Sequence, residues 1–165
     1  MKKLIFTFGI SGCGKSTWLA DKDPVIETDQ IRKEVFGSVN NYENDGYVFQ
    51  EARKRIIENL RNNDVVYFGS TMVETQYRLP FLKEVIKKCP YDLHIEIVIF
   101  KSDPEKCKER VQIDLSKGTD RADSSEVIDS QYQFYIESLK VLEKEGIYDS
   151  FKYVGFDSID EIKKL

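Results

Sequence analysis

The stretch of sequence that decides the fold is Gly9-Ile10-Ser11-Gly12-Cys13-Gly14-Lys15-Ser16-Thr17. It follows an apolar run at residues 4–8 and leads into residues 18–20, which can continue as a helix. The pattern G-x-x-x-x-G-K-[ST] between a strand and a helix is typical of the phosphate-binding P-loop. Its glycines allow a tight turn in which successive backbone N–H groups converge on an anion. The sequence therefore predicts that the chain binds a nucleoside triphosphate.

The side chains of this loop have separate predicted tasks. Lys15 can reach the β- and γ-phosphates of a nucleotide, and the Ser16 hydroxyl can ligate Mg²⁺. The alternative, a glycine-rich turn without a ligand, is disfavoured by the Lys-Ser pair and by the strand in front of the loop. The candidate nucleotide-binding residues are Gly9, Ser11, Gly12, Cys13, Gly14, Lys15, Ser16 and Thr17.

Length and composition limit the class of protein. The 165 residues are 41% hydrophobic and 33% charged, as in one soluble globular domain, which we expect to span residues 1–165. No apolar run is long enough for a membrane helix, and residues 1–3 lead straight into a strand, so we expect no signal peptide. Three cysteines without metal-type spacing favour a reducing, cytoplasmic compartment. The net charge of −4 argues against a broad basic face for duplex DNA.

Strand and helix signals alternate along the chain. Strands are expected at residues 4–8, 24–28, 65–68, 93–100 and 151–154, and helices at 30–36, 48–60, from about 79, from 104, at 126–144 and at 159–165. Pro80 is tolerable only in the first turn of its helix. This alternation predicts an α/β fold, a P-loop NTPase three-layer sandwich with a five-stranded parallel sheet. A small helical lid is expected at about residues 116–125.

Several of these pieces together resemble the kinase domain of phage polynucleotide 5′-hydroxyl kinase and its relatives. The resemblance rests on the P-loop, on Thr28-Asp29-Gln30-Ile31-Arg32 after the second strand, on Ser70-Thr71 after the third, and on a basic segment before Glu126-Val127-Ile128. Zeta-toxin-like sugar-nucleotide kinases and other small P-loop kinases carry similar pieces. The resemblance implies ATP and Mg²⁺ as cofactors and transfer of the γ-phosphate to a hydroxyl acceptor.

Asp29 and Arg32 are the candidates that narrow the function. Asp29 is the proposed general base, since phosphoryl transfer needs a carboxylate within reach of the attacking hydroxyl. The alternative is that Asp29 or Thr28 merely caps the following helix. Arg32 lies three residues further on, so a helix would place it on the same side as Asp29. The resemblance implies that Arg32 binds a phosphate of the acceptor, and the alternative is a surface arginine paired with Glu34 or Glu27.

The third strand is where this chain departs from the resembling kinases. The phage kinase carries an acidic residue at the position of Ser70 and an asparagine at that of Met72. No aspartate ends the strand, so Mg²⁺ would rest on Ser16, the phosphates and water, with Asp29 as a candidate to assist in the outer shell. Ser70 and Thr71 are candidate acceptor-binding residues, and the departure puts acceptor recognition in doubt more than nucleotide binding.

Arg110 and Arg121 are the candidate cations of the lid. A kinase must neutralise the charge that develops on the transferred phosphoryl group, and arginines from a closing segment can do so. Arg110, expected at the end of a helix, has the better alignment, and either Arg121 or Lys117 fills the second position. The alternative for each is an exposed surface residue.

These observations predict an ATP-dependent kinase. The favoured acceptor is the 5′-hydroxyl of a polynucleotide or nucleotide end. The alternatives are a kinase for a modified nucleobase hydroxyl in DNA, a nucleoside or nucleotide, or a nucleotide sugar, and a non-enzymatic switch that binds nucleotide and hydrolyses it slowly. Asp29 together with Arg32 favours a kinase over a switch.

Overall fold

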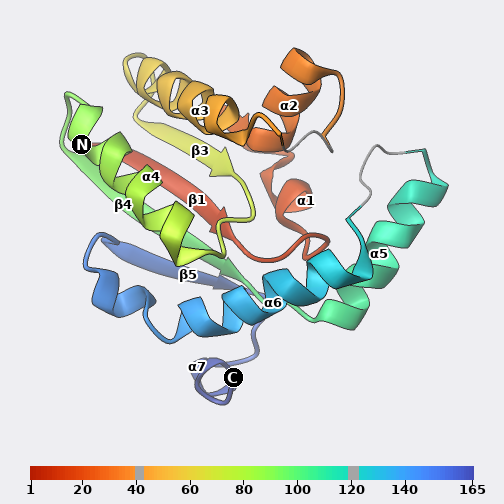
Figure 1. The fold of residues 1–165 in the computed structure, drawn as a ribbon. Coiled ribbons are helices and arrows are strands. Elements are labelled where there is room, and N and C mark those ends of the chain that lie inside the picture. Colours follow the sequence, from red (N-terminus) through yellow and green to blue (C-terminus); the bar gives the residue numbers. More distant parts are fainter. Residues whose placement is uncertain (40–42, 119–122) are drawn as a thin grey trace.

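The fold is built on one parallel sheet in the computed structural model, which describes residues 1–39, 43–118 and 123–165. The strands are β1 (Lys2–Phe8), β2 (Val25–Glu27), β3 (Val65–Gly69), β4 (Leu93–Phe100) and β5 (Ser150–Val154). Their order across the sheet is β2-β3-β1-β4-β5, and every neighbouring pair is parallel (Figure 1). The expected α/β class and five-stranded parallel sheet are therefore confirmed.

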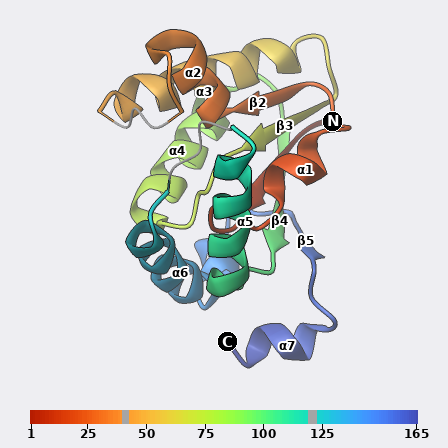
Figure 2. The same ribbon diagram turned by 90° about the vertical axis from the view of Figure 1, so that its right-hand side faces the viewer.

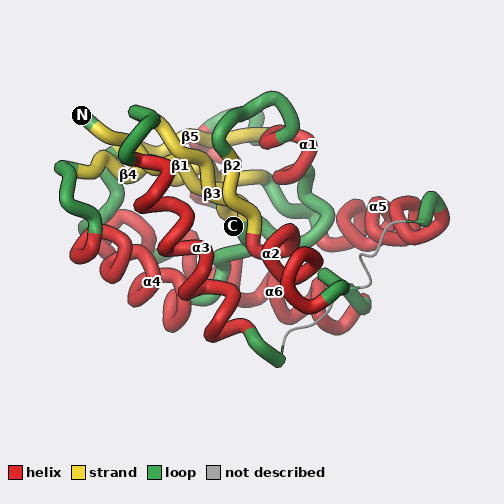
Figure 3. Tube along the Cα trace, turned by 90° about the horizontal axis from the view of Figure 1, so that it is seen from above, coloured by secondary structure: helices red, strands yellow, loops and turns green. Residues whose placement is uncertain are grey.

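Helices cover both faces of this sheet. They are α1 (Lys15–Leu19), α2 (Thr28–Phe36), α3 (Asp45–Leu60), α4 (Thr75–Lys88), α5 (Pro104–Ser116), α6 (Ser125–Leu139) and α7 (Ile159–Lys163), with a 3₁₀ helix at Leu142–Glu145. Helices α3, α4 and α6 lie on one face and α1 lies on the other, as Figures 2 and 3 show. None of the helices in the described ranges is long and apolar enough to cross a membrane.

The central position of β1 explains its sequence. This strand pairs with β3 on one side and β4 on the other, and residues 4–8 are all buried. A strand that is covered on both faces favours a continuous apolar run over an alternating one. On α3, four side chains one helical turn apart are wholly buried, as expected: Val48, Ala52, Ile56 and Leu60.

Three expected helix boundaries were wrong. Helix α4 begins at Thr75, so Pro80 is its sixth residue rather than part of the first turn. The first turn is held by the Glu74 carbonyl, which accepts from the N–H groups of Tyr77 (3.1 Å) and Arg78 (2.9 Å). Helix α2 begins at Thr28 rather than residue 30, and α6 ends at Leu139, with the separate 3₁₀ helix after it.

Candidate nucleotide and acceptor site

The P-loop turn at the end of β1 has the geometry that its glycines permit. Gly12 has a φ of 82° and Gly14 a φ of 99°, a region in which other residues are strained. A side chain at Gly12 would also approach the Cys107 carbonyl oxygen to 2.7 Å, so the loop packs directly on α5. Burial raises the pKa of the Cys107 thiol to about 11, which keeps it neutral in this packing. The turn is thus fixed by glycine on one side and by α5 on the other.

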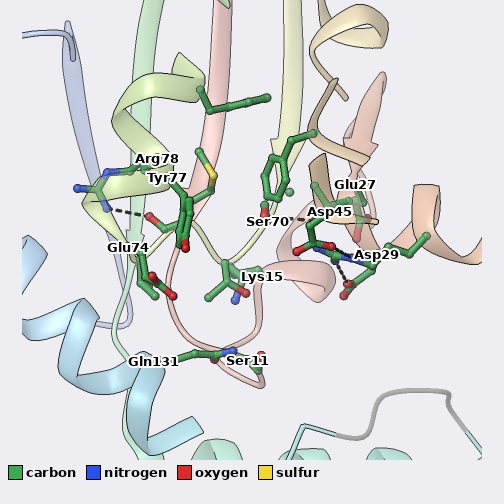
Figure 4. Close-up of a pocket in the computed structure, with 18 of the residues that line it drawn as sticks. Ser11, Lys15, Glu27, Asp29, Asp45, Ser70, Glu74, Tyr77, Arg78 and Gln131 are labelled. Atoms are coloured by element: carbon green, nitrogen blue, oxygen red, sulfur yellow. Dashed lines mark hydrogen bonds and ion pairs between the residues drawn. The ribbon is translucent and has the colours of Figure 1, made fainter. Parts of the chain in front are cut away.

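Lys15 is held close to the P-loop backbone. Its ammonium donates to the carbonyl oxygens of Gly9 (2.8 Å) and Ile10 (2.7 Å), and the residue is 7% exposed. The N–H of Ser11 donates to Gln131 Oε1 of α6 at 2.9 Å (Figure 4). Ser16, in contrast, is exposed and lines a cleft beside the loop.

A cleft with a volume of about 970 Å³ opens beside this loop. Its walls come from the P-loop, the ends of β2 and β3, and helices α2, α3, α4 and α6. The residues predicted from the sequence that line it are Ser11, Lys15, Ser16, Asp29, Arg32, Ser70 and Thr71. The topology therefore brings the loop and the two strand ends together as parallel sheets do.

Asp29, Arg32 and Asp45 form one charged cluster in this cleft. Arg32 donates from Nη1 to Asp29 at 2.8 Å and from Nε to Asp45 at 3.0 Å. The Arg32 side chain is 6% exposed, whereas those of Asp29 and Asp45 are 42% and 39% exposed. Asp29 is in the first turn of α2, whose N-cap is Glu27 with no side-chain cap hydrogen bond. Asp29 is thus not the N-cap, and its carboxylate is directed by Arg32.

The predicted partner Glu34 does not pair with Arg32 in the contacts of the described residues. Glu34 instead accepts from Arg55 at 2.9 Å, on the surface of α3. Arg55 also donates to Glu51 at 3.0 Å, so it is paired with two carboxylates, those of Glu34 and Glu51, outside the cleft. The buried position of Arg32 contradicts the alternative of an exposed surface arginine.

Arg110 lies beside the P-loop but not at the end of its helix. It is the seventh residue of α5, which extends to Ser116, and its Nη1 donates to the Gly12 carbonyl oxygen at 3.1 Å. The expectation that Arg110 ends a helix was therefore wrong, because α5 continues for almost two more turns. Lys117 is the exposed C-cap of α5. Arg121 and most of the expected lid centre fall outside the described residues, which resume at Asp123.

The end of β3 lacks a carboxylate, as the sequence indicated, but its neighbour supplies one. Glu27, the last residue of β2, pairs in register with Gly69 of β3 and lines the cleft. Ser70 Oγ accepts from the Thr28 hydroxyl at 3.2 Å, and the Thr71 carbonyl oxygen accepts from the Gly9 N–H at 3.3 Å. The sequence indicated Glu27 only as an alternative partner of Arg32 and not as a carboxylate of the site, although its place at a strand end was a signal.

Magnesium fits the residues that are present. Among the described residues no group of three His, Cys, Asp or Glu side chains is placed to hold a metal ion. Mg²⁺ at kinase sites needs no such cage, since one or two protein oxygens, waters and the nucleotide phosphates suffice. The exposed Ser16 hydroxyl and the carboxylates of Glu27 and Asp29 in one cleft meet that requirement.

Arg78 is the second buried arginine of the cleft, and no sequence pattern singled it out. It is 0% exposed and donates from Nη2 to both oxygens of Glu145 (2.5 and 3.2 Å) and from Nη1 to the Met72 carbonyl at 2.8 Å. Its Nε donates to the Tyr148 hydroxyl, and burial raises the pKa of that phenol. The network fixes the β3–α4 loop, in which Met72 has a φ of 58°.

Comparison with models of known families matches residues 4–142 to the AAA domain family AAA_33. The chain belongs to this family. Like other members of a P-loop family, this AAA domain protein has a nucleotide-binding, kinase-like fold. A search of curated protein sequences finds no match.

Solved structures support the same fold for this AAA domain protein. One is from the PezAT toxin–antitoxin system of Streptococcus pneumoniae, with a TM-score of 0.63, 12% identity, and 93% of this chain and 68% of that chain covered. A protein assigned as a kinase from Chloroflexus aurantiacus has a TM-score of 0.62 and 10% identity, with 99% and 93% covered. The tunicamycin resistance protein of Deinococcus radiodurans has a TM-score of 0.54 and 10% identity, with 99% and 93% covered. At these identities the likeness concerns the fold alone.

Proposed function

We propose that this chain is an ATP-dependent phosphotransferase that moves the γ-phosphate to a hydroxyl group of an acceptor. The observation that carries the proposal is the shared cleft: Lys15 of the P-loop and the Asp29 carboxylate line the same cavity. A nucleotide-binding loop alone would serve a switch equally well. A carboxylate held by an arginine opposite that loop is what a transfer to an alcohol needs.

The proposed reaction uses few groups. Lys15 stabilises the negative charge of the β- and γ-phosphates, and Ser16 would hold Mg²⁺, which neutralises further phosphate charge when bound. Asp29 accepts the proton of the acceptor hydroxyl as its oxygen attacks the γ-phosphorus, and the bond to the β,γ-bridging oxygen breaks. Arg32 acts as a positioning residue for Asp29. Arg110 is a candidate to neutralise the negative charge on the transferred phosphoryl group. Arg121, which lies outside the described residues, stays a candidate for the same task on the basis of the sequence.

The acceptor is the finer part of the proposal. The resemblance names the 5′-hydroxyl of a polynucleotide or nucleotide end, with Ser70, Thr71 and Arg32 as its contacts. The alternatives were a modified nucleobase hydroxyl in DNA, a nucleoside or nucleotide, and a nucleotide sugar. The described walls of the cleft favour a small acceptor without phosphate, such as a nucleoside, because the arginine expected to bind an acceptor phosphate is already paired with Asp29 and Asp45.

The test of the function is acceptor-dependent turnover in wild type and in Asp29→Asn. We expect ADP formation to rise when a hydroxyl acceptor is added, and kcat to fall by roughly 10²-fold or more in the variant. The KM for ATP should not change, since Asp29 is assigned to the acceptor. Asp64→Asn is the matched control, because Asp64 is 86% exposed and lies outside the cleft. If the rate of ATP hydrolysis does not change with any added acceptor or with Asp29→Asn, the result would support the nucleotide switch instead.

A further inference from the structure

The far side of the cleft has its own chemistry. We call it the acceptor wall: the cleft-lining part of residues 45–53 on α3 and of residues 70–84 on the β3–α4 loop and α4. It lies on both sides of the P-loop lysine: in Figure 4 Glu74, Tyr77 and Arg78 lie on one side of Lys15, while Asp45 lies with Asp29 on the other. A molecule that presents its hydroxyl to Asp29 would rest against this wall.

Arg32 brings no net positive charge to an acceptor. Its guanidinium is shared by two carboxylates, those of Asp29 and Asp45, so the three groups together carry a net charge of −1 when ionised. Two of its nitrogens, Nη1 and Nε, are engaged at 2.8 and 3.0 Å. A phosphate that bound Arg32 would lie close to both of these carboxylates, which costs electrostatic energy.

Arg78 is equally committed. It forms a bidentate pair with Glu145, whose side chain is 5% exposed, and this buried pair leaves no net charge. The remaining donors go to Met72, Thr75 and Tyr148. Although Arg78 lines the cleft, its contacts therefore stabilise the wall and leave no charge for an acceptor.

Within the described part of the wall, Arg53 is then the cation that lines the cleft together with Glu74 and Glu84. Arg53 is half-buried on α3, and both glutamates, at the start of α4 and within it, are partly exposed. Glu84 also lies 3.6 Å from Lys88, but that pair is exposed on both sides and therefore weak. The balance across the wall is negative, which repels an anionic acceptor and attracts hydrogen-bond donors.

Three aromatic rings, those of Phe49, Tyr77 and Phe81, also line the wall. Phe49 and Phe81 pack edge to face, with ring centroids 5.4 Å apart and an interplanar angle of 73°. Tyr77 is 66% exposed although its ring lines the cleft, so one face of it is available to a ligand. Rings of this kind bind flat apolar groups, and beside carboxylates they also bind amines.

We propose that the acceptor is a small alcohol without phosphate, with an aromatic or apolar body and with hydroxyl or amino groups as its polar substituents. The proposal rests on the proposed kinase function and concerns the same site. The carboxylates of the wall would accept hydrogen bonds from those substituents, the rings would contact the body, and the reacting hydroxyl would point toward Asp29.

The experiment uses acceptor pairs that differ by one phosphate. The probes are adenosine with adenosine 3′-monophosphate, glucosamine with glucosamine 6-phosphate, and glycerol with glycerol 3-phosphate, together with a 5′-hydroxyl oligonucleotide. Transfer from γ-labelled ATP is measured for each. We expect the best acceptor to lack phosphate, and its kcat/KM to exceed that of its partner by roughly tenfold, a difference that high salt reduces. An equal or better rate with the phosphate-bearing partner or the oligonucleotide overturns the inference.

A charge variant separates this inference from the kinase proposal itself. The double variant Glu74→Gln, Glu84→Gln should narrow the preference for the phosphate-free partner several-fold while the KM for ATP stays constant. A merely structural effect would lower the rates with the phosphate-free acceptor and with its phosphate-bearing partner together. An unchanged ratio of these two rates would also overturn the inference. Glu143→Gln, on an exposed side chain away from the cleft, is the control. ATP binding without transfer to any probe would count against the kinase function, not against the selectivity.

Discussion

Lys15 offers the most direct test at the scale of single residues. Replacing it by alanine removes the charge that would stabilise the β- and γ-phosphates, and we expect phosphoryl transfer to fall by at least about 10²-fold. The protein should stay folded, because the two carbonyl oxygens that accept from the ammonium belong to the loop, and the strands of the core do not depend on this contact. Steady-state rates at saturating ATP and Mg²⁺, with circular dichroism on the same samples, check this. Full activity in Lys15→Ala would refute the nucleotide site.

Arg32 has a matched counterpart elsewhere in the chain. Arg32→Lys keeps the charge, but a single ammonium cannot hold Asp29 and Asp45 in the places of Nη1 and Nε. We expect kcat to fall by roughly tenfold with an unchanged KM for ATP, because Asp29 loses its orientation. Arg55→Lys disrupts the same kind of two-carboxylate pair, with Glu34 and Glu51, outside the cleft. If both variants lose the same activity, Arg32 has no special part in positioning Asp29.

Sequence reasoning at this scale worked where function depends on local spacing. The P-loop and the three-residue step from Asp29 to Arg32 are short-range patterns, and helical geometry brings the latter pair together as predicted. Asp45 had no such signal, because it begins α3 and reaches Arg32 of α2 from 13 residues away. Pairing of that kind depends on tertiary structure and cannot be deduced from spacing.

At the scale of elements, the buried hydroxyl of Thr7 in β1 can be tested. Thr7 is 0% exposed, and among the described residues its hydroxyl has no hydrogen-bond partner. Thr7→Val removes that buried hydroxyl at nearly constant shape, so we expect the free energy of unfolding to rise by about 1 kcal/mol. Thr75→Val is the contrasting variant, since the Thr75 hydroxyl accepts from Arg78 at 2.9 Å and its loss should destabilise. Urea unfolding of the three proteins measures both effects. A destabilised Thr7→Val would contradict this account of β1.

Element types were easier to predict than element ends. The five strands and the main helices follow from apolar periodicity, but α4 accommodates Pro80 in its second turn. The anchored first turn, with Glu74 accepting two backbone N–H groups and Arg78 buried against Glu145, outweighs the missing hydrogen bond of the proline. Such compensation comes from Glu145 of the 3₁₀ helix, 67 residues after Arg78, so local rules place the helix start too late.

At the scale of the whole molecule, stability should fall in alkali. The pKa of Cys107 is raised by burial from an ordinary 9.0 to about 11, and those of Tyr135 and Tyr148 are raised by burial as well. The folded state keeps these groups protonated after the unfolded chain has begun to ionise. The contribution of Cys107 is therefore fully present below pH 9 and is lost by about pH 11, on the order of 2 kcal/mol.

Unfolding free energies measured between pH 7 and pH 11 check this expectation. Cys107→Ala should show a flatter decline than wild type above pH 9, even if its stability at neutral pH is lower because of the lost volume. Cys89→Ala controls for loss of volume at a second buried cysteine. Equal slopes in wild type and Cys107→Ala would show that this thiol does not contribute.

The charge of the acceptor wall is a property of the whole molecule that the sequence concealed. A net charge of −4 does not indicate which arginines are available to bind an anion, and from the sequence Arg32 was expected to bind a phosphate. The folded chain pairs Arg32 with Asp45 and Arg78 with Glu145, which are both distant in sequence, and the cleft becomes acidic as a result. Fold class was predictable because strand–helix alternation permits few arrangements, whereas ion pairing across elements permits many.

The strand order has a consequence for how the chain is made. β1 precedes both of its partners: Lys3 is opposite Val65 on one edge, and Leu4 is opposite Ile95 on the other. At translation rates of about 5–20 residues per second, roughly 5 to 20 s pass between synthesis of β1 and completion of β4. During that interval the apolar stretch of β1, residues 4–8, has an unpaired backbone edge, a known template for aggregation. Nascent chains stalled before β4 should therefore depend on chaperones, and codon changes that slow translation between β1 and β4 should lower the soluble yield without altering any amino acid.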